Sequence, residues 1–94
     1  MNAASGKVLA IEGELTMVTA AQWIERGRAL VRAEDLVVDL SGVSAADSSA
    51  LALLFDWMRV ARASGHRVRQ AGMPAGMRSL ATLYGVDELL PAEA

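Results

Sequence analysis

The sequence contains no cysteine and a single histidine, His66. The lack of cysteine excludes a disulfide scaffold and any zinc site built on thiolates, and it fits a reducing compartment. Without a thiol or a second histidine, His66 has no partner for a catalytic dyad, so we expect it at the surface. The motifs GxGxxG, GxxxxGK[ST] and HExxH are also missing. We therefore predict no catalytic residues, no cofactor and no metal.

Long apolar runs are missing as well. The first residues, MNAASGKVLAIEG, lack the apolar core of a secretory signal. The longest clear apolar stretch, 50–55, is far shorter than the roughly 18 residues of a membrane-spanning helix. We therefore expect a cytoplasmic protein.

Charge is low, with a formal net charge of −2, and this argues against nucleic acid as the main ligand. Apolar residues make up 53% of the chain and charged residues 21%, which excludes general disorder and predicts one folded domain over 1–94. One local segment is basic, and we expect it to be a solvated helix end. Its members are Arg59, Arg62, His66, Arg67 and Arg69.

Apolar periodicity and turn residues divide the chain into alternating strands and helices. Gly13 is expected to end the first strand, Thr19 to cap the first helix and Gly65 to follow the second helix. The predicted strands are 8–11, 35–40 and 67–70, with 15–18 as a short strand or an extended connection. The predicted helices are 20–32, one that ends near 64, one from Pro74 to 84, and a final turn at 87–90. This order predicts a single α/β domain with a small, mostly parallel (mixed) sheet, about three helices and a short C-terminal helical turn.

The most informative segment is 36–54, LVVDLSGVSAADSSALALL. Its apolar run ends at Ser41-Gly42, and a short loop then leads Asp47, Ser48 and Ser49 into a helical pattern. Free backbone N–H groups and a positive dipole end make this first turn favourable for a phosphate on either serine, or for a partner's acidic group. Alternatively Asp47 and the serines simply cap the helix, with Ser44 placed as in a capping box. Spacing alone does not separate these hypotheses.

The helix after Asp47 is apolar on more than one side. One stripe, expected to face the sheet, contains Leu51, Leu54, Met58 and Ala61; a second contains Leu53, Trp57 and Val60. The second stripe is either an exposed partner surface or is covered by the first and last helices, so Trp57 is either an interface residue or a core residue. In the first helix, Gly27 indicates a close approach to the sheet.

Scattered carboxylates give weak support for chemistry at Ser48. Asp39 and Asp47 could converge near one loop and hold a metal ion beside a serine, but we expect Asp39 to be structural or solvated. A small hydrolase that uses Ser48 is a third hypothesis, and it lacks a base that the sequence would place.

The strand LVVDLSGV, followed by a loop and DSSALALL, resembles the STAS domain, the fold of bacterial anti-sigma-factor antagonists, over nearly the whole chain. In that family the hydroxyl residue directly after the aspartate is the phosphorylation or switch position, which implies Ser48 after Asp47. The family usually has glycine two residues after this hydroxyl. Here Ala50 takes its place and is compatible with the first turn of a helix.

Within the family the chain is most similar to the MlaB branch, on the patterns ALALLFDWMRVAR, AGMPAGMRSL and MRSLATLYGVDELLP. This resemblance implies a non-enzymatic cytoplasmic subunit that binds the ATPase of a phospholipid-transport ABC complex and meets the membrane only through that complex. The implied regulatory or partner-binding residues are Ser48, Asp47, Ser49, Ala50 and Trp57. The alternative is an anti-sigma-factor antagonist controlled by phosphorylation of Ser48.

Overall fold

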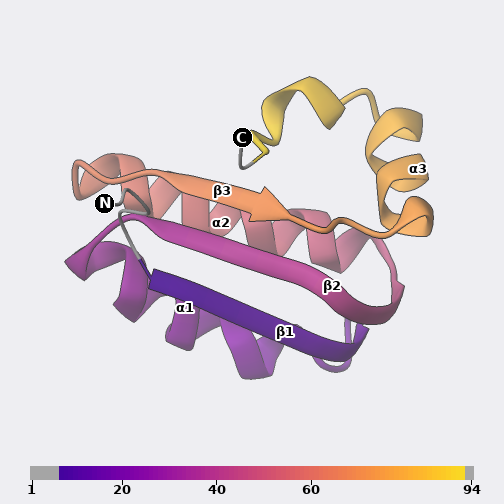
Figure 1. Cartoon of the computed structure of the whole chain (residues 1–94), viewed down its shortest axis with the longest axis horizontal. Helices are drawn as coiled ribbons and strands as arrows, with labels where there is room; N and C mark the ends of the chain where they lie inside the picture. The colour runs from indigo at the N-terminus through magenta and orange to yellow at the C-terminus, as the bar shows by residue number, and fades with distance from the viewer. Residues whose placement is uncertain (1–6, 93–94) are drawn as a thin grey trace.

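A computed structural model describes residues 7–92 as a three-stranded sheet with three α-helices and a final 3-10 turn (Figure 1). The elements in chain order are β1 (Lys7–Leu15), α1 (Ala21–Ala33), β2 (Leu36–Ala46), α2 (Ser48–Ala63), β3 (Val68–Ala71), α3 (Ala75–Leu83) and the 3-10 turn η1 (Asp87–Leu89). The predicted α/β class and helix count are confirmed. Among these residues, no helix has the length and apolar content that crossing a membrane requires.

The sheet has the strand order β1-β2-β3, and both strand pairs are parallel. The helices α1 and α2 pass behind it, on one face, while α3 lies beyond the end of β3 and η1 folds back above the open edge of β3 (Figure 1). The chain then returns to the open edge of β3, where Gln70 forms a parallel bridge with Ala92. This arrangement brings the end of β2 and the start of α2 to the edge of the sheet at which its strands end.

Most of the core lies between the sheet and the helices α1 and α2, and Met77 and Ala81 of α3 extend it. Alternate residues of the strands point into it, as the period of two requires, including Ile11 and Val38, which are fully buried. Both apolar stripes of α2 are in this core, except that Met58 is half-buried. The second stripe is covered mainly by α1. Of the two alternatives from the sequence, it is therefore the covered stripe and not an exposed partner surface.

Two strand boundaries differ from the prediction, and the pairing of β1 with β2 explains both differences. Gly13, with φ of +85°, does not end β1; register shifts on either side of it let the strand continue to Leu15. β2 likewise continues past Ser41-Gly42, because Gly42 pairs with Glu12 and Ala46 pairs with Leu15. The segment 15–18 is therefore not a second strand. It begins a turn that connects β1 to α1.

Two of the predicted caps are wrong, while the helix ends are confirmed. Ala20, not Thr19, is the N-cap of α1, and Ser44 lies in β2 rather than in a capping box. At the other end of α2, Gly65 has φ of +77° and follows the C-cap Ser64, as expected of a glycine that ends a helix. Pro74 is the N-cap of α3, and Gly85 (φ +70°) follows its end.

Candidate functional site: the start of helix α2

Asp47 joins the start of α2 to the turn that follows β1. One carboxylate oxygen, Oδ1, accepts a hydrogen bond from the N–H of Ser49 at 2.8 Å, and this makes Asp47 the N-cap. The other, Oδ2, accepts one from the N–H of Met17 at 3.0 Å. These hydrogen bonds hold the pKa of Asp47 below its usual value, and the bond from Met17 has the larger effect. The carboxylate therefore stays ionised and fixes two segments that are 30 residues apart.

Ser48 is the first residue of α2 and its side chain is exposed, as a switch position requires. The cap is supplied by Asp47, so the hydroxyl of Ser48 is not needed for that purpose. Ser49 is half-buried, and Ala50 is fully buried with 0% exposure. Ala50 therefore supports the helix start from inside rather than contacting a partner.

The turn after β1, which Asp47 ties to the start of α2 through Met17, exposes two large apolar side chains that sequence analysis did not identify as part of the site. The hydroxyl of Thr19 accepts a hydrogen bond from the N–H of Thr16 (2.9 Å) and donates one to the carbonyl of Glu14 (2.8 Å). This bonding is the reason that Thr19 does not cap α1. The closed turn leaves Met17 77% exposed and Val18 82% exposed. The signal in the sequence is the pair of threonines that flanks this apolar pair.

Two shallow hollows flank the start of α2. One, of about 380 Å³, lies between α1 and α2 and is lined by Met17, Ile24, Ser49 and Ala52 among others. The other, of about 400 Å³, lies between the end of β2 and α3 and is lined by Ala46, Pro74 and Met77 among others. Ala46 and Ser49 precede and follow Ser48 in the chain, so the helix start that carries Ser48 connects the linings of the two hollows.

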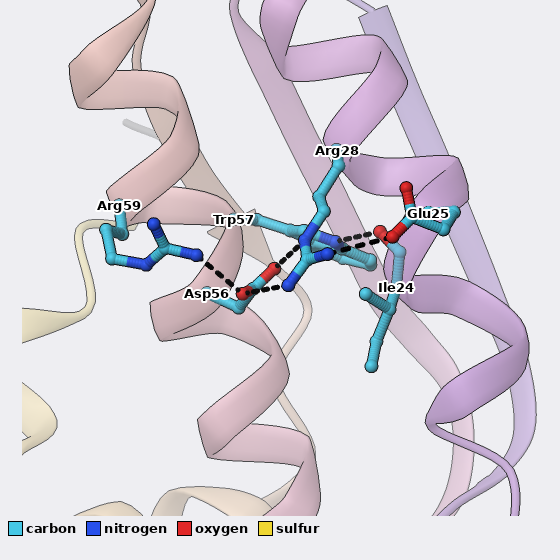
Figure 2. Close-up of polar contacts among 6 residues, drawn as sticks. All are labelled: Ile24, Glu25, Arg28, Asp56, Trp57 and Arg59. Carbon is cyan, nitrogen blue, oxygen red and sulfur yellow. Dashed lines mark hydrogen bonds and ion pairs between the residues drawn. The ribbon is translucent and has the colours of Figure 1, made fainter.

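Trp57 belongs to the core, which corrects its inclusion among the partner-binding residues. Its side chain is 0% exposed, and its indole N–H donates a hydrogen bond to the carbonyl of Ile24 at 2.9 Å (Figure 2). The ring packs against Gly27 of α1, where any side chain would overlap it. The close approach that Gly27 indicated is thus to Trp57 on α2 and not to the sheet.

An ion pair beside Trp57 also joins α1 to α2. Arg28 binds both carboxylate oxygens of Asp56, at 2.8 Å through Nε and 2.7 Å through a terminal nitrogen, and it also contacts Glu25 (Figure 2). Arg59 contacts Asp56 from the same helix at 3.1 Å. The hydrogen bonds from Arg28 lower the pKa of Asp56, against the opposing effect of partial burial. Asp56 also lines the hollow between α1 and α2, so this pair fixes one wall of it.

The two carboxylates considered for a metal site are used separately. Asp39 lies within β2 and accepts hydrogen bonds from the N–H (3.0 Å) and hydroxyl (2.7 Å) of Ser41, while Asp47 binds Met17 and Ser49. Across residues 7–92, no three His, Asp or Glu side chains gather into a possible metal site. His66 is held against α1, with 2.6 Å between its Nδ1 and the carbonyl of Val31.

Solved structures share this fold at low sequence identity. The unphosphorylated form of the anti-sigma factor antagonist SpoIIAA matches with a TM-score of 0.74 and 18% identity, covering 93% of this chain and 78% of that one. A proposed anti-sigma factor antagonist of Thermotoga maritima has a TM-score of 0.69 and 17% identity, covering 90% and 77%. A sulfate transporter family protein of Wolinella succinogenes has a TM-score of 0.68 and 13% identity, covering 89% and 70%.

The family comparison matches nearly the whole chain. No curated protein matches the sequence. A family model described as "Mlab, STAS domain" matches residues 2–91, and domains of this kind are generally non-enzymatic and mediate interactions between proteins. The chain therefore belongs to the STAS domain family and resembles MlaB within it.

Proposed function

We propose that this chain is a non-enzymatic cytoplasmic subunit that binds the ATPase of a phospholipid-transport ABC complex and supports its assembly or activity. The observation that carries the proposal is the family match over residues 2–91, to a model described by MlaB. On this proposal the protein meets the membrane only through its partner.

The start of α2 is the surface that suits such a partner. We define the Ser48 surface as the exposed or half-buried residues Ser48, Ser49, Ala52, Met17 and Val18. Its small side chains let a partner's backbone approach the N-terminus of α2, while Met17 and Val18 offer apolar area of the kind that interface cores use. Asp47 bonds to both the turn that carries Met17 and the start of α2, so this surface is already ordered before a partner binds.

A charge placed on Ser48 would change affinity for any partner of this surface. A phosphate would add about −1.5 to −2 charges next to the ionised carboxylate of Asp47. The combined charge repels an acidic partner or requires an arginine from it. The position is therefore a workable switch whether or not cells use it.

Recovery of the complex from native cells tests the proposal. We expect an ABC ATPase to co-purify with the wild-type chain and to be lost with Met17→Asp, which places a charge in the apolar part of the Ser48 surface. Val8→Asp is the matched control, because Val8 is 59% exposed at the start of β1, away from α2's start. Recovery of an anti-sigma kinase without an ABC ATPase would refute the proposal.

A second candidate is an anti-sigma-factor antagonist controlled by phosphorylation of Ser48. The similarity to unphosphorylated SpoIIAA, together with the exposed hydroxyl at the start of α2, supports it. Incubation with a cognate kinase and ATP, followed by mass spectrometry, separates the two functions. Stoichiometric phosphate on Ser48 in wild type, absent in Ser48→Ala, favours the antagonist; an unmodified Ser48 with ATPase recovery favours the transporter subunit.

A further inference from the structure

A basic hollow lies at the opposite end of the molecule from Ser48. It has a volume of about 560 Å³ and lies between the last turns of α2, the edge strand β3 and Pro91. Its walls carry Arg62, His66, Arg67 and Arg69, and its apolar lining includes Met58 and Val68. Ser48 and Arg62 are 14 residues apart on α2, about 21 Å along the helix axis, so a partner of one surface does not need to cover the other.

The positive charge of this basic hollow is only partly balanced among residues 7–92. The ion pairs of this part of the chain engage Arg28 and Arg59, and the side chains of the three arginines of the hollow form none. One carboxylate lies close by, because Asp35 accepts a hydrogen bond from the backbone N–H of Arg67 at 3.0 Å. Arg62, Arg67 and Arg69 are all exposed. Three exposed arginines line one hollow in a protein of net charge −2, and they favour an anionic occupant.

The edge of β3 forms one wall of the hollow. The N–H of Leu36 donates to the carbonyl of Arg67 (2.9 Å), so by the alternation of a parallel ladder Arg67 and Arg69 bond to β2. Val68 and Gln70 direct their backbone groups away from β2, and the N–H of Gln70 donates to the carbonyl of Pro91 (2.9 Å). Val68 is only 6% exposed, so this edge is largely covered and the exposed groups of the wall are the side chains of Arg67 and Arg69.

We infer that the basic hollow is a docking site for an acidic, extended segment of a protein partner, which places carboxylates on Arg62, Arg67 and Arg69. The apolar lining, which includes Met58, can receive the apolar side chains of such a segment while its carboxylates meet the positive charge. A concave site with an apolar floor fits a peptide better than a flat lipid surface. The overall negative charge disfavours nucleic acid.

Fluorescence anisotropy with a labelled octapeptide of alternating glutamate and valine tests the inference on the full chain. We expect saturable binding that weakens as salt is added, and no binding of the matching glutamine–valine peptide. Combining Arg67→Glu with Arg69→Glu should weaken binding at least about tenfold. Arg26→Glu combined with Arg78→Glu, an equal charge change at exposed arginines of α1 and α3, is the control and should stay within about twofold. The amide signals of Val68 and Arg69 should shift on titration.

Several results would overturn the inference: no binding of the acidic peptide, equal losses in the hollow and control variants, or binding to phosphatidylglycerol vesicles in place of peptide. The inference does not depend on the proposed function. Ser48→Glu should leave peptide affinity within about twofold of wild type. If the transporter proposal fails, ATPase recovery is lost while peptide binding remains, so the two failures are distinguishable.

Discussion

Gly27 of α1 lies directly against the indole ring of Trp57 on α2. A Cβ built on Gly27 would overlap the Cε2, Cζ2 and Nε1 atoms of that ring. The ring is also fixed by its hydrogen bond to the carbonyl of Ile24, so it cannot move aside without losing that bond. The distance between the two helices therefore depends on the absence of a side chain at Gly27.

Gly27→Ala should destabilise the protein although alanine is the better helix former. Propensity favours alanine by about 1 kcal/mol, but overpacking typically costs about 1–3 kcal/mol and here displaces a buried tryptophan. Urea unfolding measures the difference. Gly76→Ala is the matched control on α3, because a Cβ there meets nothing within 4 Å. It should be neutral or stabilising by up to about 1 kcal/mol. Equal effects of the two changes would contradict the packing argument.

Trp57→Ala should lower the free energy of unfolding by about 3–5 kcal/mol, because it empties the contact between α1 and α2. Trp57→Phe should cost less, since it keeps most of the ring and removes the indole N–H that bonds to Ile24. Chemical denaturation followed by circular dichroism measures both. A stable Trp57→Ala variant that had lost a partner would instead assign Trp57 to an interface.

Asp47→Ala should release the turn that carries Met17 as well as the start of α2. Both the Met17 and the Ser49 amides lose their acceptor, so hydrogen exchange at both should become faster. Asp47→Asn should keep one of the two amides protected, because its side-chain oxygen accepts while its NH₂ group cannot. Loss of protection at Ser49 alone in the alanine variant would show that Asp47 does not hold the turn.

Acid should destabilise the fold through Asp56 and Asp47, because the pKa values of both are lowered in the folded state. The chief cause is the hydrogen bond from Arg28 for Asp56 and the hydrogen bond from the N–H of Met17 for Asp47. A lowered folded-state pKa means that the stabilisation is complete above the unfolded value of about 3.9 and is lost as the pH falls through the folded value. The melting temperature should therefore be flat near neutral pH and fall below about pH 4. Asp56→Asn should show a smaller fall over that range, and an unchanged fall would contradict this assignment.

Ser48→Ala should leave the fold nearly intact and weaken partner binding. The cap is Asp47, so removal of the hydroxyl should cost well under the typical value of about 1 kcal/mol for a lost cap. Thermal unfolding and ATPase recovery, measured together, test this. Ser79→Ala, a change of an exposed serine on α3, serves as the control for both measurements. A large drop in melting temperature with unchanged recovery would make Ser48 a structural residue.

Local signals predicted the helices better than the strands. Gly65 and Gly85 adopt positive φ, and Pro74 precedes α3, so these residues set the helix boundaries by their own conformational limits. Strand ends depend on a partner strand instead. β2 continues through Ser41 and Gly42 because β1 runs alongside, and no local pattern in 41–46 contains that information.

The residues of the candidate site also differ in whether local sequence or long-range packing determines their role. The sequence placed Asp47, Ser48 and Ser49 at the start of a helix but left open whether Asp47 is the cap, and the structure assigns the cap to Asp47 and exposes Ser48. The role of Met17 depends on a bond across 30 residues, and the burial of Trp57 depends on how closely α1 approaches α2. Residue spacing determines which side of its own helix a residue faces, but tertiary packing decides what covers that side.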